Sequence, residues 1–278
     1  MKISKFLKRF SLFVLAVLVL FTGWQMLKTP ATTGDWQEQL KVPSIAEFSG
    51  NKVVVKNIRN FRYGPTEADM HPAYYDSEFN LDELKKVWYV TEPFNGQEYA
   101  AHTFVSFEFE HDKFLAITIE ARKTKDQQYS IWKGLVRTYP IMYIASDERD
   151  VVMLRANLRK DKVFVYPIKT TKENGQKLFV DMLTKMNDLQ TKPEWYNTLF
   201  ANCTSRIVYH VNRVVESRVP FSWKVWLTGY ADELAMDVGL LDTDLPLEEA
   251  RKKFLVTDKS NAVGDVPNYS ILIRELNK

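Results

Sequence analysis

The residue of this chain best suited to chemistry is Cys203, its only cysteine. It lies in the stretch Asn202-Cys203-Thr204-Ser205, where a polar loop runs into a segment with apolar residues at helical spacing. The unpaired amides and the positive dipole end of a helix start stabilise a thiolate over a thiol. The position therefore predicts a nucleophile; the alternative is an inert buried cysteine that packs like a small apolar residue.

Other catalytic signatures are absent from the sequence. It has no Gly-x-Gly phosphate loop, no Gly-x-Ser-x-Gly elbow, no second cysteine and no His-Glu-x-x-His motif. We therefore expect no cofactor, no metal and no nucleotide. An acid cluster could be proposed at Asp147, Glu148 and Asp150, but such a charged turn is typical of a solvated or salt-bridged corner.

Four histidines could act with the thiol. His210 lies two turns along the same helix, about 10.5 Å from Cys203, and cannot hydrogen-bond it. His111 lies in a predicted hairpin turn, roughly 30 Å of strand away from His102. His71 precedes Pro72 in an irregular segment, and spacing does not exclude it. His102, at a strand start, is the best placed partner.

The hairpin that carries His102 has two alternating strands, 102–109 and 114–121. Matching their apolar faces predicts that Phe109 pairs with Leu115 and Val105 with Ile119, with a loop of odd length. His102, Phe104, Ser106 and Glu120 then share the other face. Glu120 would face Phe104 and lie diagonal to His102, at a Cα separation of roughly 7–8 Å. This predicts a histidine base with a carboxylate that orients it.

The remaining pattern predicts an α+β fold, in which an antiparallel sheet packs against the cysteine helix. Residues 59–86 read as irregular, with a short helix at 81–86. The other predicted strands are 53–58, 87–91, 141–145, 151–154, 163–167 and a short one from 266; the other predicted helices are 172–189, the one that Cys203 opens, 223–241 and 246–256.

The N-terminus reads as an export signal. No charged residue occurs from Phe10 to Leu27, and a basic segment precedes this run. The run is just long enough to span a bilayer, and no Ala-x-Ala-like site follows it, so a retained anchor is favoured over a cleaved signal. We expect an anchor over 1–28 in the inner (cytoplasmic) membrane, a tether over 29–50 and a single extracytoplasmic domain over 51–278.

Charge gives no sign of a nucleic-acid partner. The net charge is +3, but Lys2, Lys5, Lys8, Arg9 and Lys28 flank the apolar segment. Without them the chain has 33 basic and 35 acidic residues, so the folded part carries no basic excess.

A free thiol exported to an oxidising compartment is a liability unless it has a use.

Several blocks of this sequence resemble the Lnb-type N-terminal periplasmic domain family, over about residues 50–220, with a helical extension at 221–278. The blocks are Val87-Trp88-Tyr89-Val90, His102 to Phe109, Ile119-Glu120-Ala121-Arg122, Asp147-Glu148-Arg149-Asp150, Tyr196 to Leu199 and Asn202-Cys203-Thr204.

The resemblance implies a fold similar to circularly permuted NlpC-like and papain-like thiol enzymes. It also implies lipoprotein N-acylation, in which an acyl group passes through a cysteine thioester. Carried over by motif position, Cys203 would be the nucleophile, His102 the general base and acid, and Glu120 the orienter. Asn202, Thr204 and Arg122 would be supporting residues.

The chain departs from lipoprotein acyltransferases of the family because nothing after Lys28 is apolar long enough to span a membrane. We expect a membrane-anchored cysteine acyltransferase or acyl hydrolase that acts on lipid or lipoprotein substrates. A cell-wall peptide amidase or peptidase and a non-catalytic envelope scaffold are the alternatives. The acyl donor, the acceptor and the oligomeric state stay open.

Overall fold

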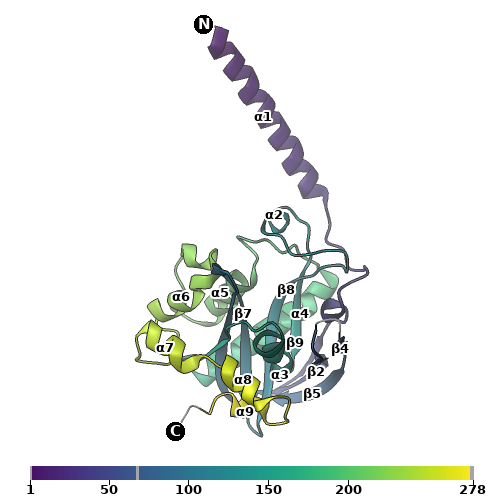
Figure 1. Cartoon of the computed structure of the whole chain (residues 1–278). Coiled ribbons are helices and arrows are strands. Elements are labelled where there is room, and N and C mark those ends of the chain that lie inside the picture. Colours follow the sequence, from purple (N-terminus) through teal and green to yellow (C-terminus); the bar gives the residue numbers. More distant parts are fainter. Residues whose placement is uncertain (1, 67–68, 276–278) are drawn as a thin grey trace.

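The computed structural model describes residues 2–66 and 69–275. Helix α1, Lys2–Leu27, stands clear of a mixed domain of strands and helices (Figure 1). Its segment Phe6–Leu27 is long and apolar enough to cross a membrane. At 1.5 Å per residue, those 22 residues extend about 33 Å, which matches the hydrocarbon thickness of a bilayer. The chain is therefore an α+β protein with one candidate membrane helix among its described residues.

The domain is built on one large sheet. Among the described residues the sheet has eight strands in the order β1-β2-β9-β8-β7-β6-β10, with β5 also paired to β2. Only β2 and β9 run parallel; the other pairs are antiparallel. The strands are β1 Ile45–Ser49, β2 Lys52–Arg59, β5 Tyr74–Asn80, β6 Leu84–Phe94, β7 Gln97–Phe109, β8 Lys113–Ala121, β9 Ile141–Ser146 and β10 Phe164–Pro167, and a separate small sheet pairs β3 Arg62–Tyr63 with β4 Met70–His71.

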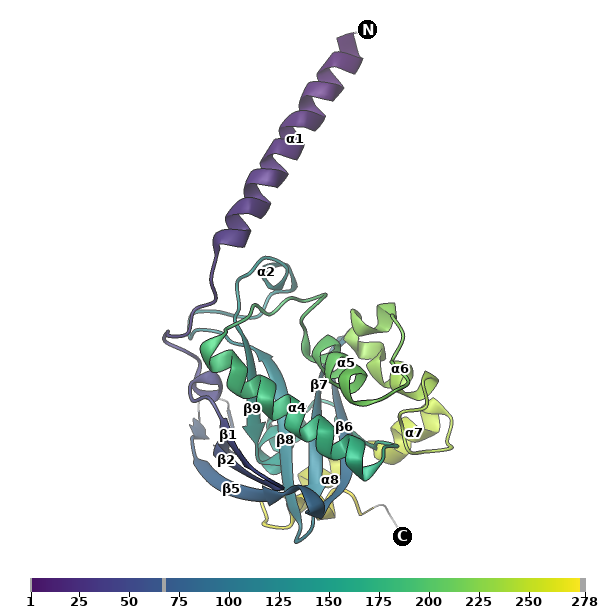
Figure 2. The ribbon, with the colours of Figure 1, turned by 180° about the vertical axis from the view of Figure 1, so that it is seen from behind.

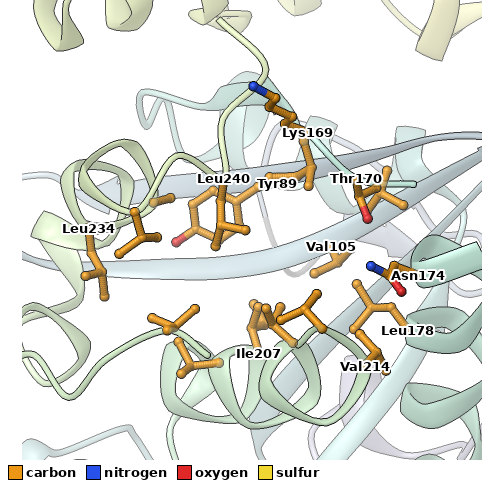
Figure 3. Close-up of a pocket in the computed structure, with 18 of the residues that line it drawn as sticks. Tyr89, Val105, Lys169, Thr170, Asn174, Leu178, Ile207, Val214, Leu234 and Leu240 are labelled. Atoms are coloured by element: carbon orange, nitrogen blue, oxygen red, sulfur yellow. The ribbon is translucent and has the colours of Figure 1, made fainter. Parts of the chain in front are cut away.

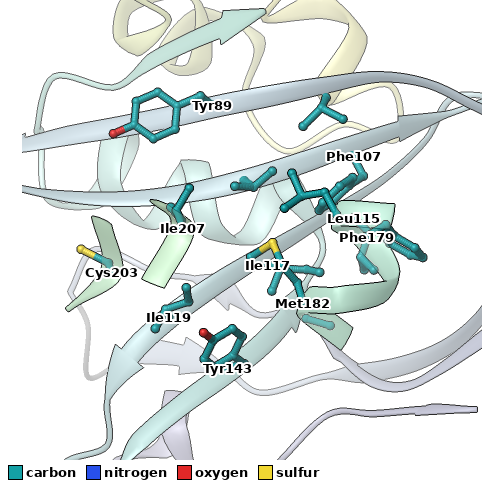
Figure 4. Packing of buried hydrophobic residues seen from close by; sticks show 14 of the residues in the cluster. Tyr89, Phe107, Leu115, Ile117, Ile119, Tyr143, Phe179, Met182, Cys203 and Ile207 are labelled. Atoms are coloured by element: carbon teal, nitrogen blue, oxygen red, sulfur yellow. The ribbon is translucent and has the colours of Figure 1, made fainter. Parts of the chain in front are cut away.

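Helices cover both faces of this sheet. On one face lie α4, Lys172–Thr191, which crosses the strands (Figure 2), and α5, Cys203–Val214. The apolar stripe of α4 packs against the inward faces of β7 and β8, with Phe179 in T-shaped contact with Phe107 and Phe109. Figure 4 shows Cys203 at one edge of this cluster, beside Ile207. The core thus fixes the start of α5 against the sheet.

The opposite face is covered by elements from the middle and the end of the chain. A second buried cluster joins Val90 and Phe104 of the sheet to Val151 and Val152 of α3 and to Tyr269. The remaining elements are η1 Glu38–Leu40, η3 Leu81–Glu83, α2 Ile131–Gly134, α3 Glu148–Met153, the π-helix η4 Leu154–Leu158, η5 Trp223–Val225, η6 Thr228–Tyr230, α6 Ala231–Asp237, α7 Leu247–Phe254, α8 Thr257–Val263 and α9 Tyr269–Leu272.

The predicted hairpin forms, but its register differs from the expected one. Phe107 pairs with Leu115 and Val105 with Ile117, so that Phe109 faces Lys113 across a three-residue loop. The predicted faces and the odd loop are confirmed, whereas the predicted partners are wrong by two residues. The shift leaves the alternation intact, because side chains two residues apart lie on the same face.

Three other predicted elements are wrong. Val151–Leu154 belongs to α3 and η4 instead of a strand; Asp147 caps α3 by accepting from the amide of Arg149. Residues 59–86 contain strand β5, and their short helix is the 3₁₀ turn 81–83. In the described part of the tail, 266–275, the chain forms α9 and no strand.

The predicted helix over 223–241 is broken around Gly229. A Cβ atom there would lie 1.9 Å from the carbonyl oxygen of Glu98, so only glycine allows this close approach to β7. The segment therefore divides into η5, η6 and α6.

The acidic turn after β9 is salt-bridged. Asp150 is buried and accepts from Arg59 at 3.0 Å, while Glu148, also buried, binds Arg274 in the C-terminal segment. The expectation of a salt-bridged corner is therefore confirmed for this turn. Its carboxylates Glu148 and Asp150 are buried and not solvated.

Candidate functional site

The cysteine helix begins with a complete cap. The side chain of Asn202 accepts from the amide of Ser205 at 2.7 Å, and the hydroxyl of Ser205 accepts from the amide of Asn202 at 2.9 Å. The Asn202 amide group also donates to the carbonyl oxygens of Thr198 and Val225. This capping box fixes where α5 begins and ties it to the two loops that flank it.

Capping leaves two helix-start amides available. The amides of Ser205 and Arg206 are used by Asn202. Within the described part of the chain, those of Cys203 and Thr204 have no acceptor, as expected for the first turn of a helix. They lie beside the sulfur, where they could bind a developing oxyanion.

His102 is the sixth of the 13 residues of β7 and is buried, so the prediction that it opens a strand is wrong. Its Nε2 lies 2.7 Å from the hydroxyl of Thr118 and 3.2 Å from Oε1 of Glu120. Glu120 therefore reaches His102 more directly than the predicted diagonal placement allowed. In the observed register Thr118 faces Phe104, and continuing that register places Glu120 directly across from His102.

The hydrogen-bond pattern settles the roles of the two imidazole nitrogens. Thr118 donates its hydroxyl proton to Glu120 at 2.8 Å, because an ionised carboxylate can only accept. The Thr118 oxygen must therefore accept from Nε2–H of His102. Nδ1 is therefore the ring nitrogen left available to Cys203, whose thiol and the imidazole shift each other's pKa.

The charges of the site favour an ion pair. Burial alone would lower the pKa of His102, but the charge of Glu120 and hydrogen bonds to Cys203 and Glu120 raise it to about 9. Burial likewise opposes ionisation of the Cys203 thiol, yet the hydrogen bond and charge of His102, with hydrogen bonds from Thr103, lower its pKa. The pKa of Glu120 falls well below its usual range despite burial, because of His102. The two shifts act in the same direction, because each favours the thiolate–imidazolium pair over the neutral pair.

A second buried charge group supports Glu120. Arg155, in the π-helix η4, donates to Glu120 at 3.4 Å and forms an ion pair with Glu92. Glu92 is fully buried and pairs with His102 across β6 and β7. A buried carboxylate needs such a partner, and Arg155 supplies it to both acids.

An apolar cavity of about 420 Å³ lies beside the cysteine helix. It is lined by Thr204, Ile207 and Val214 along α5, with Tyr89 and Leu240 across from them (Figure 3). Its exposed rim is polar and includes Lys169 and Thr170. The Thr103 hydroxyl bonds to that of Thr204 at 3.0 Å and also contacts Tyr89 and Cys203. One residue therefore connects the thiol to two of the cavity walls.

The other residues proposed from the sequence have separate places. Thr204 and Asn202 lie at the site, whereas Arg122 donates to the carbonyl oxygens of Leu40 and Lys41 and stacks on Trp36. Arg122 thus anchors the tether and does not support the thiol.

The three other histidines lie in different surroundings. His71 is exposed in β4, and His111 lies in the hairpin turn with a φ of 60°. His210 binds Tyr143 and Asp181 inside the domain. No group of three His, Cys, Asp or Glu side chains among the described residues is arranged to hold a metal ion.

Sequence reasoning missed Thr118 and Arg155. Thr118 precedes Glu120 by two positions on one strand and shares its face, a signal that the strand alternation carried. Arg155 gave no such signal, because it follows the residues 151–154 that were assigned to a strand and its approach to Glu120 depends on the tertiary packing of α3 and η4.

Comparison with known proteins gives one match. A family model described as the Lnb N-terminal periplasmic domain matches residues 71–229, which is more than half of the 278-residue chain and includes the thiol, the imidazole and both of its acidic neighbours. No curated protein and no solved structure matches the chain.

Proposed function

This chain belongs to the Lnb N-terminal periplasmic domain family, and on that premise we propose that it is a cysteine acyltransferase or acyl hydrolase. It combines a periplasmic domain with an N-terminal helix able to span a membrane, which fits an anchored extracytoplasmic protein. The observation that carries the proposal is the chain of contacts from Glu120 through His102 to Cys203 at a helix start. Its substrates would be lipids or lipoproteins at the membrane surface.

The first half-reaction forms a thioester. The Cys203 thiolate attacks the carbonyl carbon of an ester, and the amides of Cys203 and Thr204 bind the oxyanion. As the intermediate collapses, the C–O bond breaks and Nδ1–H of His102 gives its proton to the leaving alkoxide. The acyl group is then on sulfur, and His102 is neutral.

The second half-reaction restores the ion pair. An acceptor amine or water attacks the thioester carbonyl while Nδ1 of His102 takes its proton. The C–S bond breaks, and the thiolate leaves beside the imidazolium. Glu120 keeps Nε2 protonated and the ring oriented throughout, so it acts as a positioning residue.

The apolar cavity beside Thr204 favours an acyl substrate over a peptide. A methylene group occupies roughly the 30 Å³ that a water molecule has in the liquid, so 420 Å³ holds on the order of a dozen carbon atoms. Lining by valine, leucine and isoleucine suits an alkyl chain and offers few partners to the polar groups of a peptide.

The test is to incubate the full-length protein with phospholipid vesicles and measure its intact mass. We expect an added acyl mass that hydroxylamine removes, because a thioester is labile to it. The adduct should be absent in Cys203→Ala. His102→Asn should form it about 10²- to 10⁴-fold more slowly, the usual contribution of an acid–base group.

The matched control is His111→Asn, which makes the same exchange in an exposed turn whose positive φ asparagine tolerates. Acylation that survives Cys203→Ala would refute the mechanism. Labelling by muropeptides but not by phospholipids would instead indicate an amidase or peptidase. A thiol that does not react with iodoacetamide at neutral pH would indicate a non-catalytic scaffold.

A further inference from the structure

One end of the domain carries an unusual group of exposed apolar side chains. Trp132, Phe200 and Phe221 are 78%, 71% and 81% exposed, which is more than most residues of α1. We call this group the aromatic rim: Ile131, Trp132, Phe200, Phe221, Trp223 and Leu227. Exposed apolar groups of this kind mark surfaces that contact another apolar phase.

The aromatic rim is continuous across three loops. Thr198 donates to the carbonyl oxygen of Ile131 at 3.0 Å, which joins the loop of Phe200 to α2. Trp226 contacts the rings of Phe200 and Phe221 at centroid distances of 6.2 and 5.2 Å. The six residues therefore form one patch of the surface and are not scattered exposures.

The same loops hold the end of the candidate membrane helix. Nη1 of Arg137, which follows α2, donates to the carbonyl oxygen of Gln25 at 2.8 Å. Nε1 of Trp195, in the loop before Phe200, donates to the carbonyl oxygen of Lys28 at 3.4 Å. Figures 1 and 2 show α2 at the end of the domain nearest α1. The aromatic rim thus lies at the level where α1 leaves the bilayer.

We propose that the aromatic rim inserts into the interfacial layer of the bilayer that α1 spans. The partner is the lipid surface itself. Tryptophan favours this layer, because its ring is apolar while its N–H needs a polar neighbour, and phenylalanine gains from burial in the acyl boundary. The continuity of the patch with the end of α1 identifies the bilayer as its occupant, in preference to a soluble partner.

The aromatic rim is bonded through its loops to the residues beside Cys203, whatever chemistry the thiol performs. Asn202 ties the start of α5 to Val225, between Trp223 and Leu227 of the aromatic rim. Thr228 bonds both the amide and the carbonyl of Ala101, whose oxygen lies 3.9 Å from the sulfur. Insertion of the aromatic rim therefore holds the lipid surface beside the segment that is bonded to Asn202 and Ala101, the neighbours of the thiol.

The test uses the full-length chain with Cys203→Ser, so that a single new cysteine can carry an environment-sensitive fluorophore. In separate variants, Trp132, Phe200 or Phe221 is replaced by cysteine, and the fluorophore is attached to that cysteine. Each labelled protein is reconstituted in vesicles that contain spin-labelled lipid. Phe48→Cys is the matched control, since Phe48 is an exposed aromatic (43%) on strand β1, outside the aromatic rim. Leu20→Cys in α1 is the positive control.

At all three rim positions we expect blue-shifted emission and quenching by lipids labelled near the headgroup. The label at Phe48 should stay in water, and the label at Leu20 should be quenched by lipids labelled deeper in the chain. The proposal is overturned if the rim labels behave like Phe48. It is also overturned if they shift to the blue without quenching by lipid, because a second copy or another protein would then cover the patch. Unchanged thermal midpoints verify that each variant folds.

Discussion

At the residue scale, His102 is held by a different partner at each ring nitrogen. Thr118 and Glu120 take Nε2, which leaves Nδ1 for the sulfur of Cys203. A histidine held in this way cannot exchange its two roles, so under the proposed function the direction of proton transfer would be set before a substrate binds. The two groups titrate as a coupled pair, whose ion-paired form occupies a window of pH.

Both edges of that window follow from the directions of the pKa shifts. The thiolate forms as pH rises through the lowered pKa of Cys203, and the imidazolium is lost as pH rises through about 9. Glu120→Gln removes the charge that supports the imidazolium, which should lower the pKa of His102 by about 1–3 units. The pKa of Cys203 should then rise, because it loses the positive charge beside it.

The measurement is the rate of iodoacetamide alkylation of Cys203 against pH. In Glu120→Gln we expect the acid limb to move to higher pH and the rate at pH 7 to fall about tenfold. The control is Glu108→Gln, which changes a carboxylate of the same hairpin that binds Trp88 far from the thiol. An identical alkylation profile in Glu120→Gln and the unaltered protein would show that Glu120 does not set the ionisation of the site.

At the element scale, α5 has two functions, because its first turn presents the thiol and its later turns form a wall of the cavity. From Thr204 to Val214 this wall extends about 15 Å at the rise of an α-helix. We treat the part of the cavity along this wall as a slot that begins at Thr204, the residue after Cys203.

If an acyl chain occupies this slot, its length should be limited by residues midway along α5. Val211→Phe places a larger side chain in the slot, and we expect the preferred acyl donor to become shorter. Val211→Ala enlarges the slot and should shift the preference to longer chains. Competition between vesicle lipids of different chain length, resolved by the mass of the acyl-enzyme, measures both shifts.

Val211→Phe and Val211→Ala serve as controls for each other, because they change the volume of the same side chain in opposite directions. Overpacking costs typically about 1–3 kcal/mol, so a thermal midpoint should accompany each competition. A chain-length preference that is the same in folded Val211→Phe and Val211→Ala would show that the acyl chain lies elsewhere. Acyl-enzyme formation would then still support the thiol chemistry.

The elements also show where sequence reasoning ends. The faces of β7 and β8 were predictable, because alternation assigns Val105 and Ile117 to the core. Their partners were not, since registers that differ by two residues give the same pattern. Val151 and Val152 were assigned to a strand because a short apolar run does not distinguish a strand from a buried helix. In the structure the segment is a helix, because Asp147 caps its first turn and its side chains pack on the sheet.

At the scale of the whole molecule, the C-terminal segment beyond the family match is part of the core. Phe254 of α7 is buried in the main cluster and contacts the ring of Tyr166 at 5.5 Å. Arg274 neutralises the buried Glu148 of α3. These contacts join the C-terminal segment to the sheet, while a single domain over 51–278 stays a prediction that unfolding experiments can test.

Phe254→Ala should lower the free energy of unfolding by about 3–5 kcal/mol, the usual cost of deleting a buried aromatic ring. If the domain is single, the one cooperative transition moves as a whole. Denaturation of the full-length protein in detergent, followed by near-UV circular dichroism, measures this. Lys252→Ala, an exposed change in the same helix, should stay within about 0.5 kcal/mol. Two transitions, of which only one responds to Phe254→Ala, would instead indicate a separate C-terminal unit.

Sequence features singled out the central residues of the candidate site, because a lone thiol at a helix start is a local feature and strand alternation relates His102 to Glu120. His102 nevertheless lies in the middle of β7 and not at a strand start. Cys203, His102 and Glu120 do lie together. Arg122 was misplaced because β8 ends at Ala121, so the strand alternation that relates Thr118 to Glu120 does not extend to it; its guanidinium donates to the carbonyl oxygen of Leu40. The buried charges behind Glu120 come from segments remote in sequence, and only the fold brings them there.

The hydrogen bonds from Arg137 and Trp195 to the end of α1 leave the domain little freedom to rise from the lipid. Under the proposed function and with the aromatic rim inserted, the thiol would stay at a constant height and meet lipid substrates by their lateral diffusion in the leaflet. Under the proposed function, turnover would follow the mole fraction of substrate within the membrane, and adding more vesicles of the same composition would not accelerate it. Diluting the substrate with inert lipid would slow the reaction even when its bulk concentration stays constant.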